Sequence, residues 1–224
     1  MRSSALESMS PDLQEVVLKS QQRLAWYSAY ANDEGIEPPT FFASAMSSQN
    51  PRDVASSIRE FLGFGDEAPI HGPDKVRTLV LSMEEAGVLV ARNSVVESST
   101  KRRLDVEEFR GFTIEDDGFC LVFVNTRDAK TAQLFSLAHE LGHVVLGKPG
   151  VSDHAHGVQL ERWCNQFASE FIAPASLVQK LFDDTLPIKD EVEGLARRFG
   201  LSREAMLWRL RELELIDQEE ALRM

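Results

Sequence analysis

The sequence predicts an α+β fold in which helices surround a small mixed or antiparallel sheet. Segments with helical apolar spacing occupy both ends of the chain, and two runs rich in β-branched and aromatic residues, 109–114 and 119–124, lie between them. The two runs are separated by residues 115–118, Glu-Asp-Asp-Gly, which are typical of the turn of a β-hairpin. The order is therefore helices, a small sheet and then further helices, which is an α+β plan.

Three helices and one strand are expected before the hairpin, over residues 11–31, 51–61, 74–86 and from 88 onward. Ser10 suits the N-cap of the first helix, and Pro11 suits its first turn. Gly87 ends the third helix. The polar residues 92–107 are expected to form a mobile connection.

A His-Glu-x-x-His motif follows the hairpin, at His139, Glu140 and His143. Residues four apart on a helix project from the same face, so both imidazoles can reach a single Zn²⁺ ion. Glu140 can reach a water on that ion and act as a general base. The surrounding run, which ends at Gly147, is apolar enough to bury the helix, and buried histidines need partners that a metal would supply.

The third ligand is expected on the next helical segment, residues 158–173. The extended motif with Gly at 146 and His at 149 is excluded, because the chain has Leu146 and Pro149. Glu161 and Asn165 are four apart and share one face of this segment. Glu161 could therefore bind the metal while Asn165 orients a ligand histidine.

Alternatives to Glu161 remain open, because a helix carboxylate is more often simply solvated. Glu170 lies on the same segment but shares the face of Glu161 and Asn165 less well. A residue of the loop that follows the first site helix could also supply the ligand, and the choices there are Asp153, His154 and His156.

These segments together resemble the ImmA/IrrE family of bacterial metallo-endopeptidases. The resemblance is carried by residues 135–143, 161–168, 171–174, 108–112 and 121–125. It covers most of residues 51–215 and is far more specific than the zinc motif alone.

The resemblance implies a small zincin-like domain in which His139, His143 and Glu161 bind Zn²⁺ and Glu140 is the catalytic base. It also implies cleavage of a regulatory protein, a helix-turn-helix repressor or an antitoxin-like protein, and links to mobile elements or stress-response loci. In zincins a sheet edge near the zinc helix holds the substrate backbone, and the strand at 119–124 could be this edge or a plain interior strand. The alternative function is a binding module that sequesters such a regulator, with zinc as a structural element.

The chain is expected to have an N-terminal helical extension over 1–50, a zincin-like domain over 51–182 and a C-terminal helical segment over 183–224. The last segment resembles a helix-turn-helix, in which Gly200 suits the turn and Ser202 the N-cap of the second helix. Its arginines alternate with acidic residues instead of forming a basic cluster. Direct nucleic-acid binding by this segment is therefore not expected.

Composition limits the function classes further. The 224 residues are 43% hydrophobic, which supports one sizeable core, and they contain no run long enough for a membrane span. The N-terminal residues lack the apolar core of a signal peptide, so we expect a cytoplasmic protein without membrane contacts. The net charge of −12 disfavours phosphate backbones and suits a basic protein partner. The two cysteines, Cys120 and Cys164, form no metal or redox motif and are expected to be buried thiols.

Overall fold

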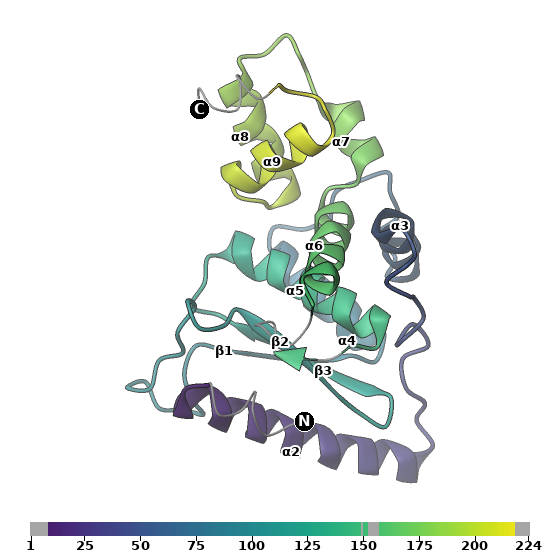
Figure 1. Ribbon diagram of the computed structural model, residues 1–224, viewed down its shortest axis with the longest axis vertical. Coiled ribbons are helices and arrows are strands. Elements are labelled where there is room, and N and C mark those ends of the chain that lie inside the picture. Colours follow the sequence, from purple (N-terminus) through teal and green to yellow (C-terminus); the bar gives the residue numbers. More distant parts are fainter. Residues whose placement is uncertain (1–8, 149, 152–156, 218–224) are drawn as a thin grey trace.

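The computed structural model describes residues 9–148, 150–151 and 157–217, and it has the α+β architecture that the sequence predicts (Figure 1). In chain order the elements are α2 (Pro11–Glu34), α3 (Pro51–Phe61), α4 (Lys75–Glu85), β1 (Leu89–Asn93), β2 (Gly111–Asp116), β3 (Phe119–Asn125), α5 (Lys130–Leu146), β4 (Gly150–Val151), α6 (Val158–Ile172), α7 (Ala175–Leu181), α8 (Ile188–Phe199) and α9 (Arg203–Glu212). None of the helices in these described ranges is long and apolar enough to cross a membrane.

The sheet is mixed and has the strand order β1-β3-β2-β4. Strand β1 pairs in parallel with β3, whereas β2 is antiparallel to both β3 and β4. The predicted hairpin is confirmed, since Asp116 of β2 lies opposite Phe119 of β3. Strand β3 lies between β1 and β2 and all its residues are buried, so it is an interior strand and not an edge strand. Strand β2 lies between β3 and β4 and also contacts α5, the helix with the His-Glu-x-x-His motif.

Two helical layers cover the two faces of the sheet (Figure 1). Helix α2 crosses one face, and α5 packs on the other with α3, α4 and α6 behind it. Alternate residues of β3 enter separate cores, because successive side chains of a strand point to opposite faces. Those on the α2 side are Phe119, Leu121 and Phe123, and those on the α5 side are Cys120, Val122 and Val124. Both cysteines are buried free thiols, as expected, and burial raises the pKa of Cys120 to about 12.

The connection between β1 and β2 is tied to the sheet and to α2, so the expectation of a mobile connection over 92–107 is wrong. Val96 and Leu104 are each only 1% exposed and belong to the core under α2. Val95 and Arg103 form an isolated antiparallel bridge. The polar composition of 92–107 suggested mobility, but the two apolar side chains Val96 and Leu104 attach this segment to the core.

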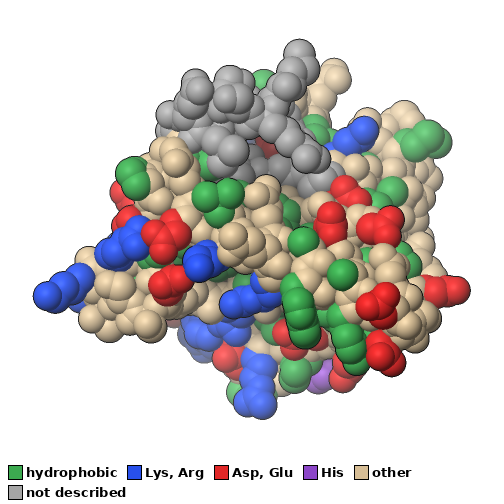
Figure 2. Space-filling model, turned by 90° about the horizontal axis from the view of Figure 1, so that it is seen from below, with side chains coloured by type: hydrophobic (Ala, Val, Ile, Leu, Met, Phe, Trp, Pro, Cys, Tyr) green, Lys and Arg blue, Asp and Glu red, His purple; other side chains and the backbone are tan. Residues whose placement is uncertain are grey.

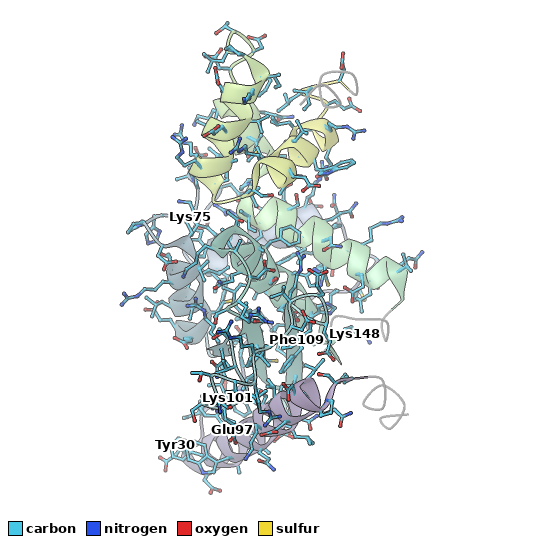
Figure 3. The ribbon with its side chains drawn as sticks, turned by 90° about the vertical axis from the view of Figure 1, so that its left-hand side faces the viewer. Tyr30, Lys75, Glu97, Lys101, Phe109 and Lys148 are labelled. Carbon is cyan, nitrogen blue, oxygen red and sulfur yellow. The ribbon has the colours of Figure 1, made fainter. Side chains whose placement is uncertain are left out.

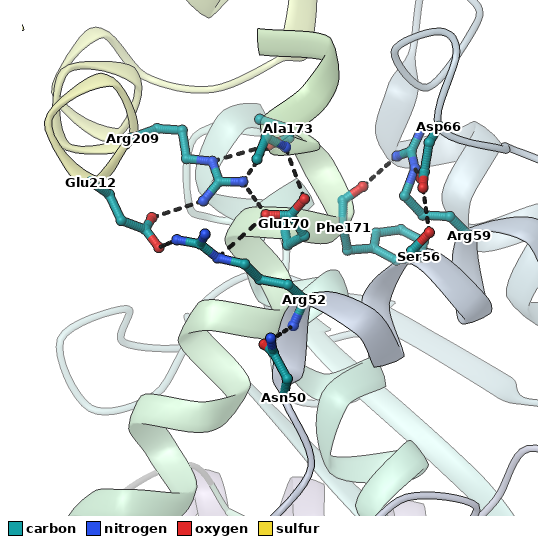
Figure 4. A network of polar contacts seen from close by, with 11 residues as sticks. Asn50, Arg52, Ser56, Arg59, Asp66, Glu170, Phe171, Ala173, Arg209 and Glu212 are labelled. Carbon is teal, nitrogen blue, oxygen red and sulfur yellow. Dashed lines mark hydrogen bonds and ion pairs between the residues drawn. The ribbon is translucent and has the colours of Figure 1, made fainter. Parts of the chain in front are cut away.

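The C-terminal helices α8 and α9 are joined by the turn that the sequence predicts. Helix α8 ends before Gly200, and the Ser202 side chain accepts a hydrogen bond from the Ala205 backbone, as an N-cap does. A buried ion pair attaches this segment to α6 (Figure 4). The Arg209 guanidinium, 1% exposed, pairs with the Glu170 carboxylate and donates to the Ala173 carbonyl oxygen.

Two neighbouring charges extend this ion pair towards the surface (Figure 4). Glu212 lies 2.8 Å from the Arg209 guanidinium and 2.9 Å from that of Arg52 on α3. Burial by itself would raise the pKa of the Glu212 carboxyl, but these two guanidinium groups outweigh that effect and lower it. The network therefore joins α3, α6 and α9 through charged groups.

Replacing Glu170 by Gln should destabilise the protein by about 3 kcal/mol, because it leaves the buried Arg209 charge with only the more exposed Glu212 as its anion. Chemical denaturation followed by circular dichroism measures the free energy of unfolding. The matched control is Glu193→Gln, which breaks an exposed pair with Arg197 and should cost at most about 0.5 kcal/mol. Equal effects of the two substitutions would show that the buried network does not hold the C-terminal helices.

Candidate metal centre

Helix α5 carries the His-Glu-x-x-His motif in its last two turns and ends directly before Gly147, as predicted. His139 and His143 are 8% and 1% exposed, so they are buried as the apolar run indicates. Their Nε2 atoms lie 3.2 Å apart. The helix thus presents two imidazole nitrogens to one point.

Glu161 of α6 reaches the same point. Its carboxylate oxygens lie 3.2 Å from His139 Nε2 and 3.6 Å from His143 Nε2. Two ligand atoms about 2 Å from a tetrahedral Zn²⁺ ion are about 3.3 Å apart, so these separations suit such an ion. The three side chains form a group that could hold a metal ion. Two imidazoles and one carboxylate leave a fourth coordination position for a reactant, which is the donor pattern of catalytic zinc sites.

The other imidazole nitrogens are held by hydrogen-bond partners. His139 Nδ1 lies 2.9 Å from Asn165 Oδ1, which is the contact that the sequence predicts for Asn165. His143 Nδ1 lies 3.1 Å from the carbonyl oxygen of Lys148. A carbonyl oxygen only accepts hydrogen bonds, so Nδ1 of His143 is the donor and Nε2 keeps a lone pair for a metal. Sequence reasoning missed Lys148, since a backbone acceptor leaves no signal in residue identity.

The electrostatic surroundings of the two imidazoles differ. Burial by itself lowers the pKa of His139, but the hydrogen bond to Glu161 and the charges of Glu140 and Glu161 raise it overall. Burial is also the largest effect on His143, and there the pKa is lowered. The carboxylates that suit a cation thus also favour a proton on His139, so protons and a metal would compete for this nitrogen.

The Glu140 carboxylate lies beside the cluster on the inner side of α5 and is 1% exposed. Thr113 of β2, which is equally buried, donates its hydroxyl to Glu140 Oε2 over 2.7 Å. A Cβ atom on Gly111 would lie only 3.1 Å from Glu140 Oε1 and 3.0 Å from the Phe123 carbonyl oxygen. Glycine at this position therefore makes room for the carboxylate. The alternation of strand β2 places Thr113 on the α5 face, but its role was not visible before the register of the strand was known.

The cluster opens into a cleft of about 500 Å³. One wall is the segment from Val106 to Gly111 that leads into β2, and another is formed by α5 and α6. The turn between α8 and α9 contributes Leu201 and Ser202, and the first turn of α9 contributes Ala205. Phe109 of the first wall, labelled in Figure 3, packs its ring on Phe112 and Phe123 of the sheet. The C-terminal segment therefore lines the same cleft as the candidate metal site.

The structure places one of the other candidates for the third ligand, Glu170, away from the histidine pair. Glu170 is buried in the ion pair with Arg209 and also accepts a hydrogen bond from the Ala175 backbone, so it belongs to another network. Asp153, His154 and His156 lie outside the described residues.

Comparison with known families connects this geometry to other proteins. The model of the IrrE N-terminal-like domain, Peptidase_M78, matches residues 83–211, which is more than half of the chain. The chain belongs to this family. Membership of the Peptidase_M78 family confirms the resemblance inferred from the motifs and indicates a metallopeptidase-like domain. The matched range includes β1 to β3, the two site helices and most of α9, but not α2 or α3.

Comparisons with curated proteins and with solved structures add little to the family assignment. A search of curated proteins finds no match. A solved structure titled "Mycobacterium tuberculosis transcriptional regulator" is similar over 72% of this Peptidase_M78 chain, with 19% identity and a TM-score of 0.46. The match covers 46% of that structure, so this chain spans less than half of its length.

Replacing Glu161 by Ala should lower zinc affinity more than replacing Asn165 by Ala, because it removes one of the three donor side chains. Replacing Asn165 by Ala should lower it about 10- to 100-fold, because His139 loses the group that orients it. Competition with a chromophoric chelator measures both affinities. The control is Gln166→Ala, an exposed neighbour on α6 that should bind zinc as the unchanged protein does. Unchanged zinc affinity in Glu161→Ala would exclude this residue as a ligand.

Replacing Thr113 by Val should leave zinc affinity unchanged and lower peptide hydrolysis about tenfold, because one hydrogen bond to a buried charged group is lost. The fall should be in kcat with KM unchanged, because Thr113 positions the Glu140 carboxylate. Thr100→Val, at an exposed position, is the control. An unchanged kcat in Thr113→Val would show that this hydrogen bond does not position Glu140 for the reaction.

Proposed function

We propose that this chain is a zinc-dependent endopeptidase that cleaves a helix-turn-helix repressor or an antitoxin-like regulatory protein in the cytoplasm. The observation that supports this proposal best is the position of Glu140. Its carboxylate is buried beside the His139, His143 and Glu161 donors and lines the same open cleft. A metal site built only for structure would need a fourth protein ligand and no adjacent base.

The chemistry follows from this arrangement. Bound Zn²⁺ would act as a Lewis acid on the scissile carbonyl group and make a water more acidic. Glu140 takes the proton from the attacking water and passes it to the leaving amine. The Thr113 hydroxyl fixes one oxygen of Glu140, and the other oxygen, beside Gly111 in the cleft lining, would take the proton. Asn165 and the Lys148 carbonyl keep the imidazoles in the orientation that leaves Nε2 to the metal.

The cleft has room for a short stretch of polypeptide. Its wall from Val106 to Gly111 begins with a turn and joins the sheet only at its end, where the Asn125 backbone donates to the Arg110 carbonyl oxygen. A bound peptide would therefore lie against the side chains of this wall. We infer that specificity comes from side chains along this wall and from the α8–α9 turn.

Charge supports a protein partner over a nucleic acid. The net charge of −12 repels phosphate backbones and attracts basic proteins, a class to which DNA-binding regulators belong. In the helix-turn-helix-like segment Arg209 is buried, and Arg197 and Arg203 both pair with Glu193. These arginines therefore do not form the clustered basic face that DNA binding needs.

The decisive variant is Glu140→Gln, which keeps the shape of the side chain and removes the base. It should bind zinc normally and cleave the regulator encoded next to it about 10²- to 10⁴-fold more slowly. Mass spectrometry of the incubated regulator measures cleavage, and Glu204→Gln, an exposed carboxylate on α9, is the control. Cleavage at the unchanged rate would show that Glu140 is not the base.

The same experiment separates the binding-module alternative. A sequestering protein would bind the regulator with equal affinity in the Glu140→Gln variant, would leave it intact in both forms, and would keep its biological effect. Loss of that effect in the variant, with binding retained, identifies hydrolysis as the function.

A further inference from the structure

Helix α2 has an exposed face that nothing in the described chain covers. Its buried side packs on the sheet through residues such as Leu13 and Leu24. On the opposite side Leu18, Trp26 and Tyr30 are 50%, 69% and 46% exposed. The Trp26 and Tyr30 rings are stacked with centroids 5.8 Å apart. Large exposed aromatic side chains on one helix face are characteristic of protein interaction sites.

The charges of this face are divided along the helix. Lys19 and Arg23 are exposed before Trp26, and Asp33 and Glu34 are exposed after it. Figure 2, which views the molecule from the α2 side, shows Lys and Arg gathered towards the left and Asp and Glu more frequent towards the right. The N-terminal half of α2 corresponds to the left, since α2 runs from left to right in Figure 1.

The segment between β1 and β2 adds charges of both signs beside the first turns of α2. Asp12 and Glu15 both pair with Arg102 of that segment, which leaves one negative charge among the three. Glu97 of the same segment pairs with Lys19 over 3.3 Å, and both side chains are more than half exposed. Figure 3 shows Lys101 and Glu97 of the same segment close to α2, with Tyr30 further along the helix.

We propose that this face binds a second copy of the chain, with the two α2 helices antiparallel across a two-fold axis close to Trp26. In that arrangement residues at equal distances before and after Trp26 meet, so Lys19 and Arg23 of each copy lie near Asp33 and Glu34 of the other. A parallel arrangement would place like charges together. The face is thus complementary to itself, which a two-fold interface requires.

The position of α2 in the fold is consistent with this use. It lies outside residues 83–211, which the family model matches. It covers the sheet face opposite α5, so pairing through its outer side leaves the cleft of each copy open. With 24 residues it is about 36 Å long, enough for contacts over six turns.

Sedimentation velocity at micromolar concentration tests the proposal. The unchanged chain should sediment as a dimer and Trp26→Asp as a monomer with unchanged circular dichroism, because Trp26 is exposed and makes no core contact. The matched control is Trp208→Asp, which removes an equally exposed tryptophan, 59% exposed, from α9 and should remain dimeric. A monomeric unchanged chain would overturn the proposal, as would a dimer that Trp26→Asp leaves intact.

A charge exchange tests the antiparallel order. The variant Lys19→Glu/Arg23→Glu and the variant Asp33→Lys/Glu34→Lys should each dimerise at least about tenfold more weakly than the unchanged chain, because like charges then meet. Mixed together they should form a heterodimer, since each supplies the charge that the other lacks. If the mixture stays monomeric, or if either variant alone dimerises normally, this packing is wrong. The proposal does not depend on peptidase activity.

Discussion

The close contact between α5 and α6 is the constraint on which the rest of the structure depends. Glu161 can reach the histidine pair only if the two helix axes approach closely, and the contact is made at Gly142. A Cβ atom there would lie 3.2 Å from the Phe167 ring and 3.4 Å from Cys164 Sγ. Packed interiors resist even one added methyl group, so the glycine sets the separation of the helices. The position between the two histidines therefore matters for packing as much as the histidines do for chemistry.

The far end of α6 is fixed by charge instead. The last carbonyl groups of a helix have no partner within it and carry partial negative charge. Here two buried guanidinium groups from distant elements supply the partners: Arg59 of α3 bonds the Phe171 carbonyl oxygen, and Arg209 of α9 bonds that of Ala173 (Figure 4). Burial lowers the pKa of Arg59, and its pairing with Asp66 opposes this effect. Helix α6 is thus held by apolar contact near Glu161 and by cations at its C-terminal end.

The sequence predicts those parts that depend on local patterns. Helix α5 and its end at Gly147, the hairpin around residues 115–118, and the cap at Ser202 are each encoded within a few neighbouring residues, and all are present. The approach of Glu161 to the histidines could be proposed because helical spacing relates Glu161 to Asn165. The contacts of Glu140 with Thr113 and Gly111 could not be derived, since they depend on the register of β2 against a helix about 27 residues later. The ion pair of Glu170 could not be predicted either. Its partner Arg209 is 39 residues away in the chain, and arginine is a residue type that is usually exposed.

Helix α6 carries both Glu161 of the candidate metal site and Glu170, which holds the C-terminal segment. Glu161 lies in the first turn of α6 and Glu170 in its last, about 14 Å apart along a continuous helix. Arg209 forms an ion pair with Glu170. The α8–α9 turn of the same C-terminal segment lines the cleft together with Glu161. The C-terminal segment and the candidate metal site are therefore positioned by the same helix. The shape of the cleft therefore depends on charges buried at the opposite end of α6, where no residue touches a reactant.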